Sequence, residues 1–406
     1  MILVFGGTTE GRAAVATLDA AGQIYYYSTK GNLQQVETKH GVCISGAMEV
    51  VQITAFCREH EIHLLVDAAH PFAEQLHRNI AQAAEELNIP VIRYERIYPP
   101  RDPAWIWCDS YTEVCRWLKN QGIRNLLALS GVQTIPKLKA YWSEYPCRFR
   151  VLDRLESREL ALKYGFPVKN LVFWDEGKSE DELLLQLQPD AILTKESGNS
   201  GYFCEKVAAA RKLNIPVVVI KRPVLPDGFY MVTGNNGLRH RVERLLPGFF
   251  PLNSGFTTGS CACAAAKSAL LTLLAGTIQQ QITITLPCGE EVELPVARTE
   301  SEGQSVICTV VKDAGDDPDV TNKREISAKV TLTDQSGVQF RAGKGVGTVT
   351  LPGLGLEIGE PAINPVPRKM MINEIKRLLA AYQLTKGVIV EIAVPGGEEL
   401  GRKTFN

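Results

Sequence analysis

The sequence lacks the marks of a membrane-bound, secreted or nucleic-acid-binding protein. No apolar run approaches the roughly 20 residues that span a bilayer, and Met1 leads straight into the strand-like segment ILVF without a basic, apolar leader. Neither sign of charge is in excess, because 44 Lys and Arg residues nearly balance 45 Asp and Glu residues. We therefore expect a soluble, cytoplasmic protein without nucleic-acid or membrane partners, which meets any anionic ligand with local clusters of charge.

The sequence also lacks CxxC pairs. Its ten cysteines are scattered, and several, such as Cys57 and Cys115, lie in apolar strand or helix patterns, where a reduced thiol packs as a small hydrophobe. Cys261 and Cys263 form a CxC pair with no nearby histidine to complete a metal site. We expect neither structural disulfides nor a bound metal, and the length of 406 residues predicts two or three domains.

Short apolar runs alternate with amphipathic stretches over the first 245 residues, a pattern typical of a parallel α/β sheet. The pattern occurs twice, and the segment LNIPV, at 87–91 and again at 213–217, closes a helix and opens a strand each time. We predict two Rossmann-like parallel-sheet lobes, residues 1–104 and 105–245. The proline-bearing segment 97–105 forms the crossover between them.

The repeat makes two loops equivalent: DAAHPFA (67–73) and TKESGNSG (194–201). Both follow a predicted parallel strand at its carboxyl end, where open α/β sheets bind ligands. A cleft between the two lobes is the expected site, and a strand that ends before Ser130 and Gly131 adds a third loop, which we assign to cofactor binding.

The segment FGGTTEGR (5–12) joins the first predicted strand to the first helix. Glycines at such a turn let the backbone approach a phosphate, and the helix N-terminus stabilises its charge. The spacing is GGxxxG rather than GxGxxG, so a dinucleotide site and a tight strand-to-helix turn both remain open. On the first interpretation, the cofactor-binding residues are Gly6, Gly7, Thr8, Thr9, Glu10 and Gly11.

The second predicted strand ends in Ser28, Thr29 and Lys30. An enzyme that uses NAD places an acidic residue there for the ribose hydroxyls. Its absence, together with the lysine, favours a 2′-phosphate and hence NADPH over NADH; a merely polar strand end is the alternative.

Several polar residues are expected in the cleft. His70 suits proton transfer at neutral pH, and Lys195 follows the equivalent strand, so both are candidate catalytic residues. Arg93 and Arg96, with Ser197 and Gly198, are candidates for binding the carboxylates of an acidic substrate. Each has a structural alternative as a loop, cap or surface residue.

These motifs together identify a family resemblance. The segments ILVFGGTTEGR, LLVDAAHPFAEQLHRNIAQAAEELNIPVIRYER and ILTKESGNSGYFCEKVAAARKLNIPVVVIKRP resemble the precorrin-6A reductases of corrin synthesis, in order, over nearly all of residues 1–245. The resemblance implies that a nicotinamide cofactor reduces a ring double bond of precorrin-6A, or of its cobalt complex, to give the 6B form. It also implies a macrocyclic substrate with many carboxylate arms.

After a Pro- and Gly-rich passage, residues 252–406 shift towards hairpin-like strands and a few helices, which predicts a smaller α+β domain. The motifs GFTTGSCACAAAKSA, VKDAGDDPDVTN, GKGVGTVTLPGLGLEIGEPAINPVPRKMM and VEIAVPGGEELGRKTFN resemble cobalt-precorrin-5B C(1)-methyltransferase from its first residues onward. This resemblance implies a fusion of two corrin-pathway enzymes and favours a cobalt-bearing substrate. That family extends beyond this point into a region expected to bind S-adenosylmethionine, so we expect a partial methyltransferase and a longer natural protein.

At the start of this second domain, Thr257, Thr258 and Ser260 are candidates for binding substrate carboxylates, with helix capping as the alternative. The aspartates of the segment DAGDDPD (313–319) have the wrong spacing for a calcium loop, and Asx turns are the better interpretation.

Two other functions remain open. The chain could be a non-catalytic protein that binds a tetrapyrrole and hands it to other corrin-pathway enzymes. The Tyr-x-x-x-Lys pair of Tyr202 and Lys206 would instead fit a short-chain dehydrogenase acting on another substrate.

Overall fold

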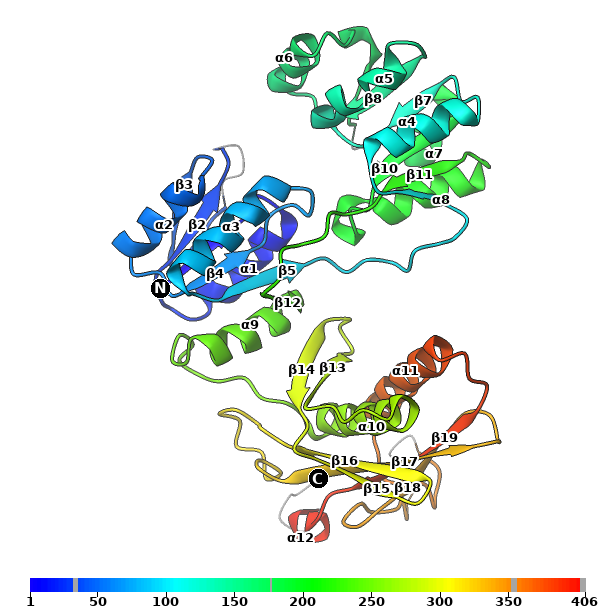
Figure 1. Cartoon of the computed structure of the whole chain (residues 1–406). Helices are drawn as coiled ribbons and strands as arrows, with labels where there is room; N and C mark the ends of the chain where they lie inside the picture. Colours follow the sequence, from blue (N-terminus) through cyan, green and yellow to red (C-terminus); the bar gives the residue numbers. More distant parts are fainter. Residues whose placement is uncertain (32–35, 176, 352–355, 402–406) are drawn as a thin grey trace. The chain divides into compact units, whose positions relative to one another are not determined.

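The computed structural model describes residues 1–31, 36–175, 177–351 and 356–401, and Figure 1 shows their helices and strands. The chain divides into two compact units, which are described separately below. The first contains residues 1–68, 83–94 and 228–406, and the second contains residues 69–82 and 95–227.

A six-stranded sheet in the order β12-β5-β4-β1-β2-β3 organises the start of the chain (Figure 1). The pairings β1–β2, β2–β3, β1–β4 and β4–β5 are all parallel. The strands are β1 (Ile2–Phe5), β2 (Tyr25–Thr29), β3 (Gly41–Ser45), β4 (Leu64–Asp67), β5 (Val91–Glu95) and β12 (Phe229–Thr233). The helices are α1 (Thr9–Asp19), α2 (Val50–Glu59), α3 (Glu74–Leu87) and α9 (Gly234–Leu245).

The second unit contains another six-stranded sheet, in the order β6-β11-β10-β7-β8-β9, again with parallel pairings. Alternate residues of its strands face two hydrophobic clusters: Leu127 and Ile192 lie in one, whereas Leu126 and Leu193 lie in the other. Both faces are therefore covered, as expected for a parallel sheet. The strands are β6 (Ile106–Cys108), β7 (Leu126–Ala128), β8 (Cys147–Val151), β9 (Leu171–Phe173), β10 (Ala191–Lys195) and β11 (Val217–Ile220). The helices are α4 (Tyr111–Asn120), α5 (Lys139–Trp142), α6 (Leu155–Lys163), α7 (Glu180–Leu187) and α8 (Phe203–Lys212).

The two sheets repeat one topology, which confirms the prediction of two Rossmann-like lobes. Strands β1 to β5 and strands β7 to β11 take the same relative order, so β4 corresponds to β10 and β1 corresponds to β7. The loops 67–73 and 194–201 are thus equivalent, and the loop at Ser130 and Gly131 corresponds to the glycine loop after β1.

The second lobe ends earlier than the sequence led us to expect. Residues 229–245 form β12 and α9, and β12 pairs with β5 of the first sheet. Leu238 and Val242 of α9 are fully buried in the hydrophobic core of the first lobe, and Tyr94 Oη donates to Asn235 Oδ1 at 2.9 Å. These contacts join the end of the reductase-like segment to its beginning, and local sequence patterns do not reveal such long-range contacts.

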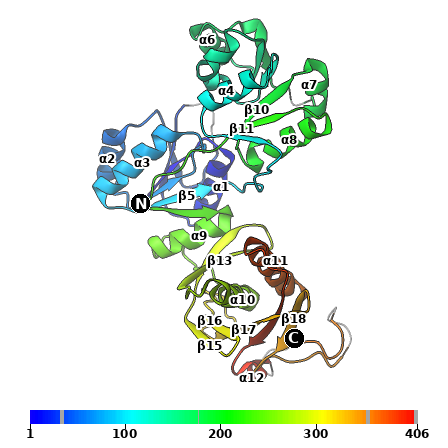
Figure 2. The ribbon, with the colours of Figure 1, turned by 45° about the vertical axis from the view of Figure 1, so that its right-hand side comes forward.

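The α+β domain predicted for the remaining residues is built around α10 (Thr258–Ala275). Figure 2 shows this helix beside α11 (Pro365–Ala381) and the strands β16 and β17, in agreement with their contacts. Helix α10 is long and apolar enough to cross a membrane by length and composition, but 61% of that stretch is buried in the domain core. The five-stranded sheet has the order β15-β16-β17-β19-β18, with a separate hairpin β13–β14. These elements are β13 (Gln281–Thr285), β14 (Glu291–Pro295), β15 (Arg298–Glu302), β16 (Ser305–Val311), β17 (Glu325–Thr333), β18 (Val338–Ala342), β19 (Gly387–Ala393) and α12 (Gly397–Gly401).

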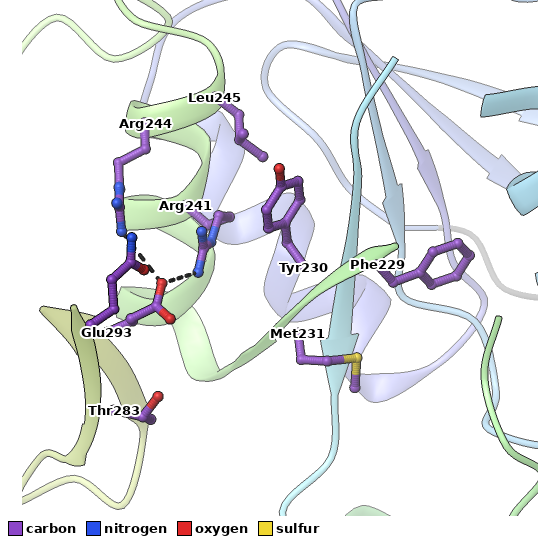
Figure 3. Close-up of a pocket in the computed structure, with 9 residues that line it drawn as sticks. Phe229, Tyr230, Met231, Arg241, Arg244, Leu245, Thr283 and Glu293 are labelled. Carbon is purple, nitrogen blue, oxygen red and sulfur yellow. Dashed lines mark hydrogen bonds and ion pairs between the residues drawn. The ribbon is translucent and has the colours of Figure 1, made fainter. Parts of the chain in front are cut away.

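The hairpin β13–β14 joins this domain to α9 of the first lobe. The Glu290 carboxylate, in the hairpin turn, accepts hydrogen bonds from the amides of Asn235 (3.1 Å) and Asn236 (2.8 Å) in the first turn of α9. Farther along, Glu293 pairs with Arg241 and Arg244 of the same helix (Figure 3). The contact is thus made by a charged cap at the helix start and by ion pairs at its end.

A buried ion pair fixes the carboxyl end of the first sheet. Arg93 Nη1 lies 3.0 Å from Asp67 Oδ1, the two residues are register partners in β5 and β4, and their side chains are 1% and 0% exposed.

We expect Asp67→Ala to lower the free energy of unfolding by about 3–5 kcal/mol, because it removes one half of a buried ion pair and leaves the other charge in place. The double variant Asp67→Leu with Arg93→Met should lose much less, since it removes both charges. Hydrogen exchange of the β4 and β5 amides measures both effects, and equal loss in the single and double variants would contradict this account.

Candidate functional site

The glycine loop after β1 is packed against a tyrosine from β2. A Cβ at Gly6 would lie 2.3 Å from the Tyr27 ring, and one at Gly11 would lie 2.7 Å from Tyr27 Oη. The Gly7 amide donates to Tyr27 Oη at 2.9 Å, and the Gly6 amide donates to Ser28 O at 2.9 Å. Gly6 and Gly11 are thus required by packing, whatever the loop binds. Sequence reasoning missed Tyr27, although it stands at a buried position of a tyrosine-rich strand.

Thr8 ties this loop to the one after β4. Its Oγ1 caps helix α1 by accepting from the Gly11 amide at 2.9 Å, and it donates to Ala68 O at 2.7 Å. Strands β1 and β4 are the neighbours at which the strand order reverses, and open α/β sheets bind ligands in the crevice at that point. The N-terminus of α1 opens there, with Thr9 exposed and Glu10 buried in the first turn. This geometry suits an anionic group.

The three residues predicted to select the cofactor differ in accessibility. Ser28 is buried, with its Oγ 3.7 Å from Met48 Sδ, and Thr29 Oγ1 donates to Gly31 O at 3.1 Å. Lys30 is exposed at the end of β2. Of the three, Lys30 is the side chain available to a ligand phosphate.

In the second unit, the two candidate catalytic residues both lie near the ring of Phe72. Lys195 Nζ is 5.1 Å from the centre of the Phe72 ring, and the His70 ring centre is 5.9 Å from it. The Phe72 amide donates to His70 Nδ1 at 3.2 Å, which fixes the ring of an otherwise exposed histidine. The structure therefore brings His70 and Lys195 together through a residue that the sequence analysis did not single out.

Lys195 is electrostatically unusual. Burial and, to a smaller extent, the nearby positive charge of Lys137 together lower its pKa to about 8. A lysine with such a pKa releases a proton near neutral pH, and perturbed groups of this kind are concentrated at functional sites.

The residues after Lys195 hold the loop in place. Arg96 is buried, and its Nη1 donates to Ser197 O at 2.7 Å. Gly198 has φ of 68°, and a Cβ there would lie 3.0 Å from Arg96 Cβ. The Glu196 carboxylate accepts a bidentate pair of hydrogen bonds from the Arg101 guanidinium (3.0 and 2.9 Å) and a third hydrogen bond from the Arg222 amide (2.9 Å). Arg96, Ser197 and Gly198 therefore anchor the loop to the crossover segment.

The expectation that Arg93 binds substrate does not fit the structure. Its guanidinium is 1% exposed and is paired with Asp67. A substrate carboxylate would reach it only by displacing that buried partner, so Arg93 is a structural residue of the first sheet.

Ser130 and Gly131 occupy the loop after β7, as predicted. Ser130 Oγ is 2.7 Å from Thr134 Oγ1, and Gly131 has φ of 83°, which favours glycine. A Cβ at Gly131 would meet no atom within 4 Å, so the backbone there stands open to an approaching group.

The Tyr202 and Lys206 side chains have other partners than each other. Lys206 Nζ donates to Gly201 O at 2.8 Å, and the Tyr202 ring, in a residue 55% exposed, lies 5.6 Å from Trp174. This arrangement gives the short-chain-dehydrogenase interpretation no geometric support.

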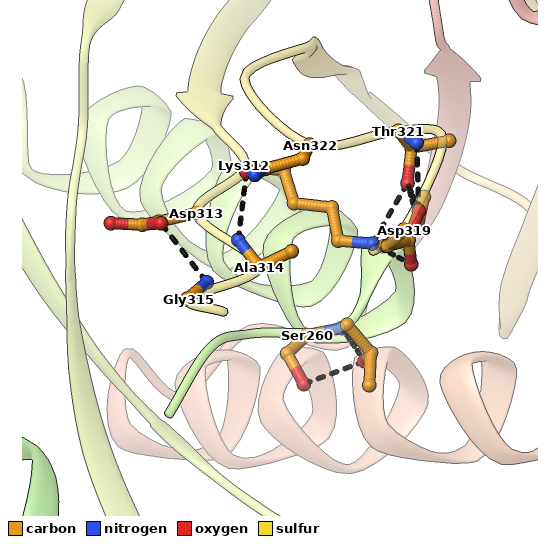
Figure 4. A network of polar contacts seen from close by, with 10 residues as sticks. Ser260, Lys312, Asp313, Ala314, Gly315, Asp319, Thr321 and Asn322 are labelled. Atoms are coloured by element: carbon orange, nitrogen blue, oxygen red, sulfur yellow. Dashed lines mark hydrogen bonds and ion pairs between the residues drawn. The ribbon is translucent and has the colours of Figure 1, made fainter. Parts of the chain in front are cut away.

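In the second domain, the predicted binding residues act as caps. Thr257 Oγ1 caps α10 by accepting from the Ser260 amide at 3.1 Å, and Thr258 Oγ1 lies 3.0 Å from Thr321 Oγ1. Figure 4 shows the adjoining network, in which the buried Lys312 ammonium pairs with Asp319 and also contacts Thr321. The pairing with Lys312 and bonds from Thr321 hold the pKa of Asp319 well below its usual range, at about 2.

The aspartate-rich loop forms Asx turns, as predicted. Asp313 Oδ1 accepts from the Gly315 amide at 3.1 Å, and Asp319 Oδ1 accepts from the Thr321 amide at 2.7 Å. Across the residues that the structure describes, no group of three or more His, Cys, Asp or Glu side chains is arranged to hold a metal ion. All ten cysteines are free thiols.

Comparisons with known proteins match the chain in two segments. The family model described as precorrin-6x reductase CbiJ/CobK matches residues 1–243, and the CbiD model matches residues 248–406. A solved structure of CobK precorrin-6A reductase aligns with a TM-score of 0.50 and 22% identity over 60% of this chain and 97% of its own, which supports the fold. A cobalamin biosynthesis protein (CbiD) from Archaeoglobus fulgidus aligns at 31% identity and a TM-score of 0.30 over 38% of this chain and 48% of its own.

Curated relatives match the second segment. Cobalt-precorrin-5B C(1)-methyltransferases from a Bradyrhizobium species and from Leptospira borgpetersenii are 54% and 50% identical over 157 and 155 residues, each covering 38% of this chain. The chain spans 42% of the length of each of these relatives. Because the reductase model matches more than half of its residues, the chain belongs to the precorrin-6x reductase (CbiJ/CobK) family of cobalamin biosynthesis, with a CbiD-family region fused behind it.

Proposed function

We propose that residues 1–245 reduce a ring double bond of cobalt-precorrin-6A, or of precorrin-6A, with NADPH as the preferred hydride donor. The observation that carries this proposal is the Thr8 hydrogen bond to Ala68 O, which joins the glycine loop and the loop after β4 at the reversal of strand order. The fit of a dinucleotide rests on the open N-terminus of α1, where Thr9 is exposed.

The chain's own residues divide the binding task. Thr8, Thr9 and the backbone of Gly6, Gly7 and Gly11 line the phosphate position, and Lys30 pairs with a 2′-phosphate. Ser130 and Gly131 supply the corresponding loop of the other lobe. The bound nicotinamide supplies a hydride to one ring carbon, and the protein orients the ring and excludes water.

A proton must also reach the carbon next to the one that accepts the hydride. Lys195 is the residue best suited to deliver it, because it is largely buried, charged below about pH 8 and placed at the carboxyl end of β10. His70, whose ring also lies near Phe72, is the alternative donor. The loop 194–201 is positioned by Arg96, Ser197 and Gly198. In this proposal, the backbone of that loop faces the substrate.

For the CbiD-family region, we propose a contribution to C(1) methylation of a cobalt-bearing precorrin-5B, with S-adenosylmethionine as the methyl donor. The support is the identity to curated methyltransferases and the intact capped start of α10. We further propose other corrin-pathway enzymes as partners and a cytoplasmic location, which fits ten unpaired thiols.

The direct test adds cobalt-precorrin-6A and NADPH or NADH to the purified chain and follows the macrocycle spectrum together with nicotinamide absorbance. Stoichiometric oxidation of the nicotinamide with formation of the 6B spectrum is the expected result. A chain that binds the ring without oxidising either cofactor would instead be a handover protein.

We expect the kcat/KM of the reductase to fall as the pH rises through about 8, because deprotonation of Lys195 removes the proton donor. Lys195→Met should lower kcat by about 10²–10⁴-fold, the usual contribution of a general acid, and abolish this limb of the pH profile. Lys137→Met should move the limb to higher pH, since Lys137 lowers the pKa of Lys195. An unchanged limb in Lys195→Met would assign the proton to another group.

We expect Lys30→Asp to shift the cofactor preference towards NADH by about 10–100-fold in kcat/KM, the effect of losing one charge-assisted hydrogen bond of about 1.5–3 kcal/mol. Lys39→Asp, which makes the same charge change at another exposed lysine of this lobe, is the matched control and should leave the preference as it is. Equal use of both cofactors before and after the Lys30 substitution would refute a 2′-phosphate role.

A further inference from the structure

A pocket of about 590 Å³ lies in the first unit where the reductase lobe meets the CbiD-family domain (Figure 3). Its wall comes from β12 and α9 of the lobe and from β13 and β14 of the domain. None of its lining residues belongs to the glycine loop, to the loop 69–73 or to the loop 195–201.

The two sides of the pocket are held in register by specific contacts. Glu290 caps the first turn of α9, and the Glu291 amide donates to Thr233 Oγ1 at 2.8 Å. A Cβ at Gly237 would lie 2.9 Å from Glu291 O, so the hairpin and the helix approach closely at this point. The pocket therefore lies at an interface that is held by specific hydrogen bonds and close backbone packing.

The pocket carries surplus positive charge. Two guanidinium groups, those of Arg241 and Arg244, share the single carboxylate of Glu293 at 2.8 and 3.5 Å. The Arg244 side chain is 44% exposed and sits at the longer of the two distances, so its planar fork is available to a second carboxylate.

Two large side chains of β12 also line the pocket. Tyr230 and Met231, on β12 at the edge of the first sheet, are 41% and 49% exposed. The Arg241 guanidinium lies 4.9 Å from the centre of the Tyr230 ring and holds the ring in place. An exposed aromatic and a methionine beside a guanidinium pair suit a flat apolar body with anionic arms.

We propose that this junction pocket binds a carboxylate-bearing tetrapyrrole. Arg244 pairs with one carboxylate arm, and Tyr230 and Met231 cover part of the ring. The choice of ligand class rests on the proposed function, because both reactions of the fused chain have an acid-bearing tetrapyrrole as substrate. The pocket retains the ring on the chain at the point where its two enzymes meet.

The test is equilibrium binding of uroporphyrin III, a stable tetrapyrrole with eight carboxylates, followed by porphyrin fluorescence anisotropy without nicotinamide. Arg244→Gln should weaken binding about tenfold, the loss of one guanidinium–carboxylate pair. Glu293→Gln should tighten binding several-fold, because it removes the carboxylate that competes for both arginines. Arg58→Gln, at an exposed position of α2, is the matched charge control and should not change the affinity.

The sign of the Glu293 effect decides between a binding role and a structural one. If Glu293 only fastened the two domains, Glu293→Gln would loosen the junction and weaken binding. Weaker binding in that variant, unchanged binding in Arg244→Gln or no binding by the wild type each overturns the proposal. Thermal melting checks folding, and Tyr230→Ala, with weaker binding expected, serves as a further variant should Glu293→Gln fold poorly.

A reductase assay of the wild-type chain is run in parallel. An active reductase with no effect of Arg244→Gln on porphyrin binding refutes the junction pocket alone. An inactive reductase with the expected binding changes refutes the proposed reaction and leaves the pocket standing.

Discussion

The order of parallel strands is the constraint on which the rest of this structure depends. In each sheet, the first and fourth strands of the repeat are neighbours, and the connections from their carboxyl ends leave on opposite faces. The loops that carry Thr8 and Ala68 are therefore brought together, and a 2.7 Å hydrogen bond joins them. Lys195 takes the corresponding place in the second sheet. Thr8 and Lys195 are thus positioned by this topology rather than by their neighbours in sequence.

Burial sorts the charged residues of the reductase segment into two roles. Arg93 and Glu196 are almost inaccessible and are paired with opposite charges, so they hold strands and crossover segments in place. Lys195 is also largely buried, but burial and the like charge of Lys137 lower its pKa to about 8. A buried charge with a partner stabilises the fold, whereas a buried lysine without such compensation gains reactivity.

The fusion adds a contact that neither of the two matched segments contains alone. Helix α9 belongs to the core of the first lobe, and its first turn and its arginines Arg241 and Arg244 contact the hairpin of the following domain. The helix therefore packs into the core of the lobe with one face and makes polar contacts to the following domain with another. This explains how a charged pocket arises at the junction, because arginines that would face solvent in an isolated lobe are partly enclosed by β13 and β14.

The sequence by itself determined the two α/β lobes and the equivalence of the loops 67–73 and 194–201. It also determined the α+β class of the last domain and the Asx turns of its aspartate-rich loop. All four follow from hydrophobic periodicity, repeats and turn chemistry, which act over a few residues. Only the tertiary structure decided that β12 completes the first sheet, that Tyr27 packs under the glycine loop, that His70 and Lys195 both lie near Phe72, and that Arg93 is buried. These outcomes depend on which residues, distant in the chain, come into contact and exclude water from each other. A local pattern shows that a residue is charged or aromatic, and the partner that determines its role comes from the fold.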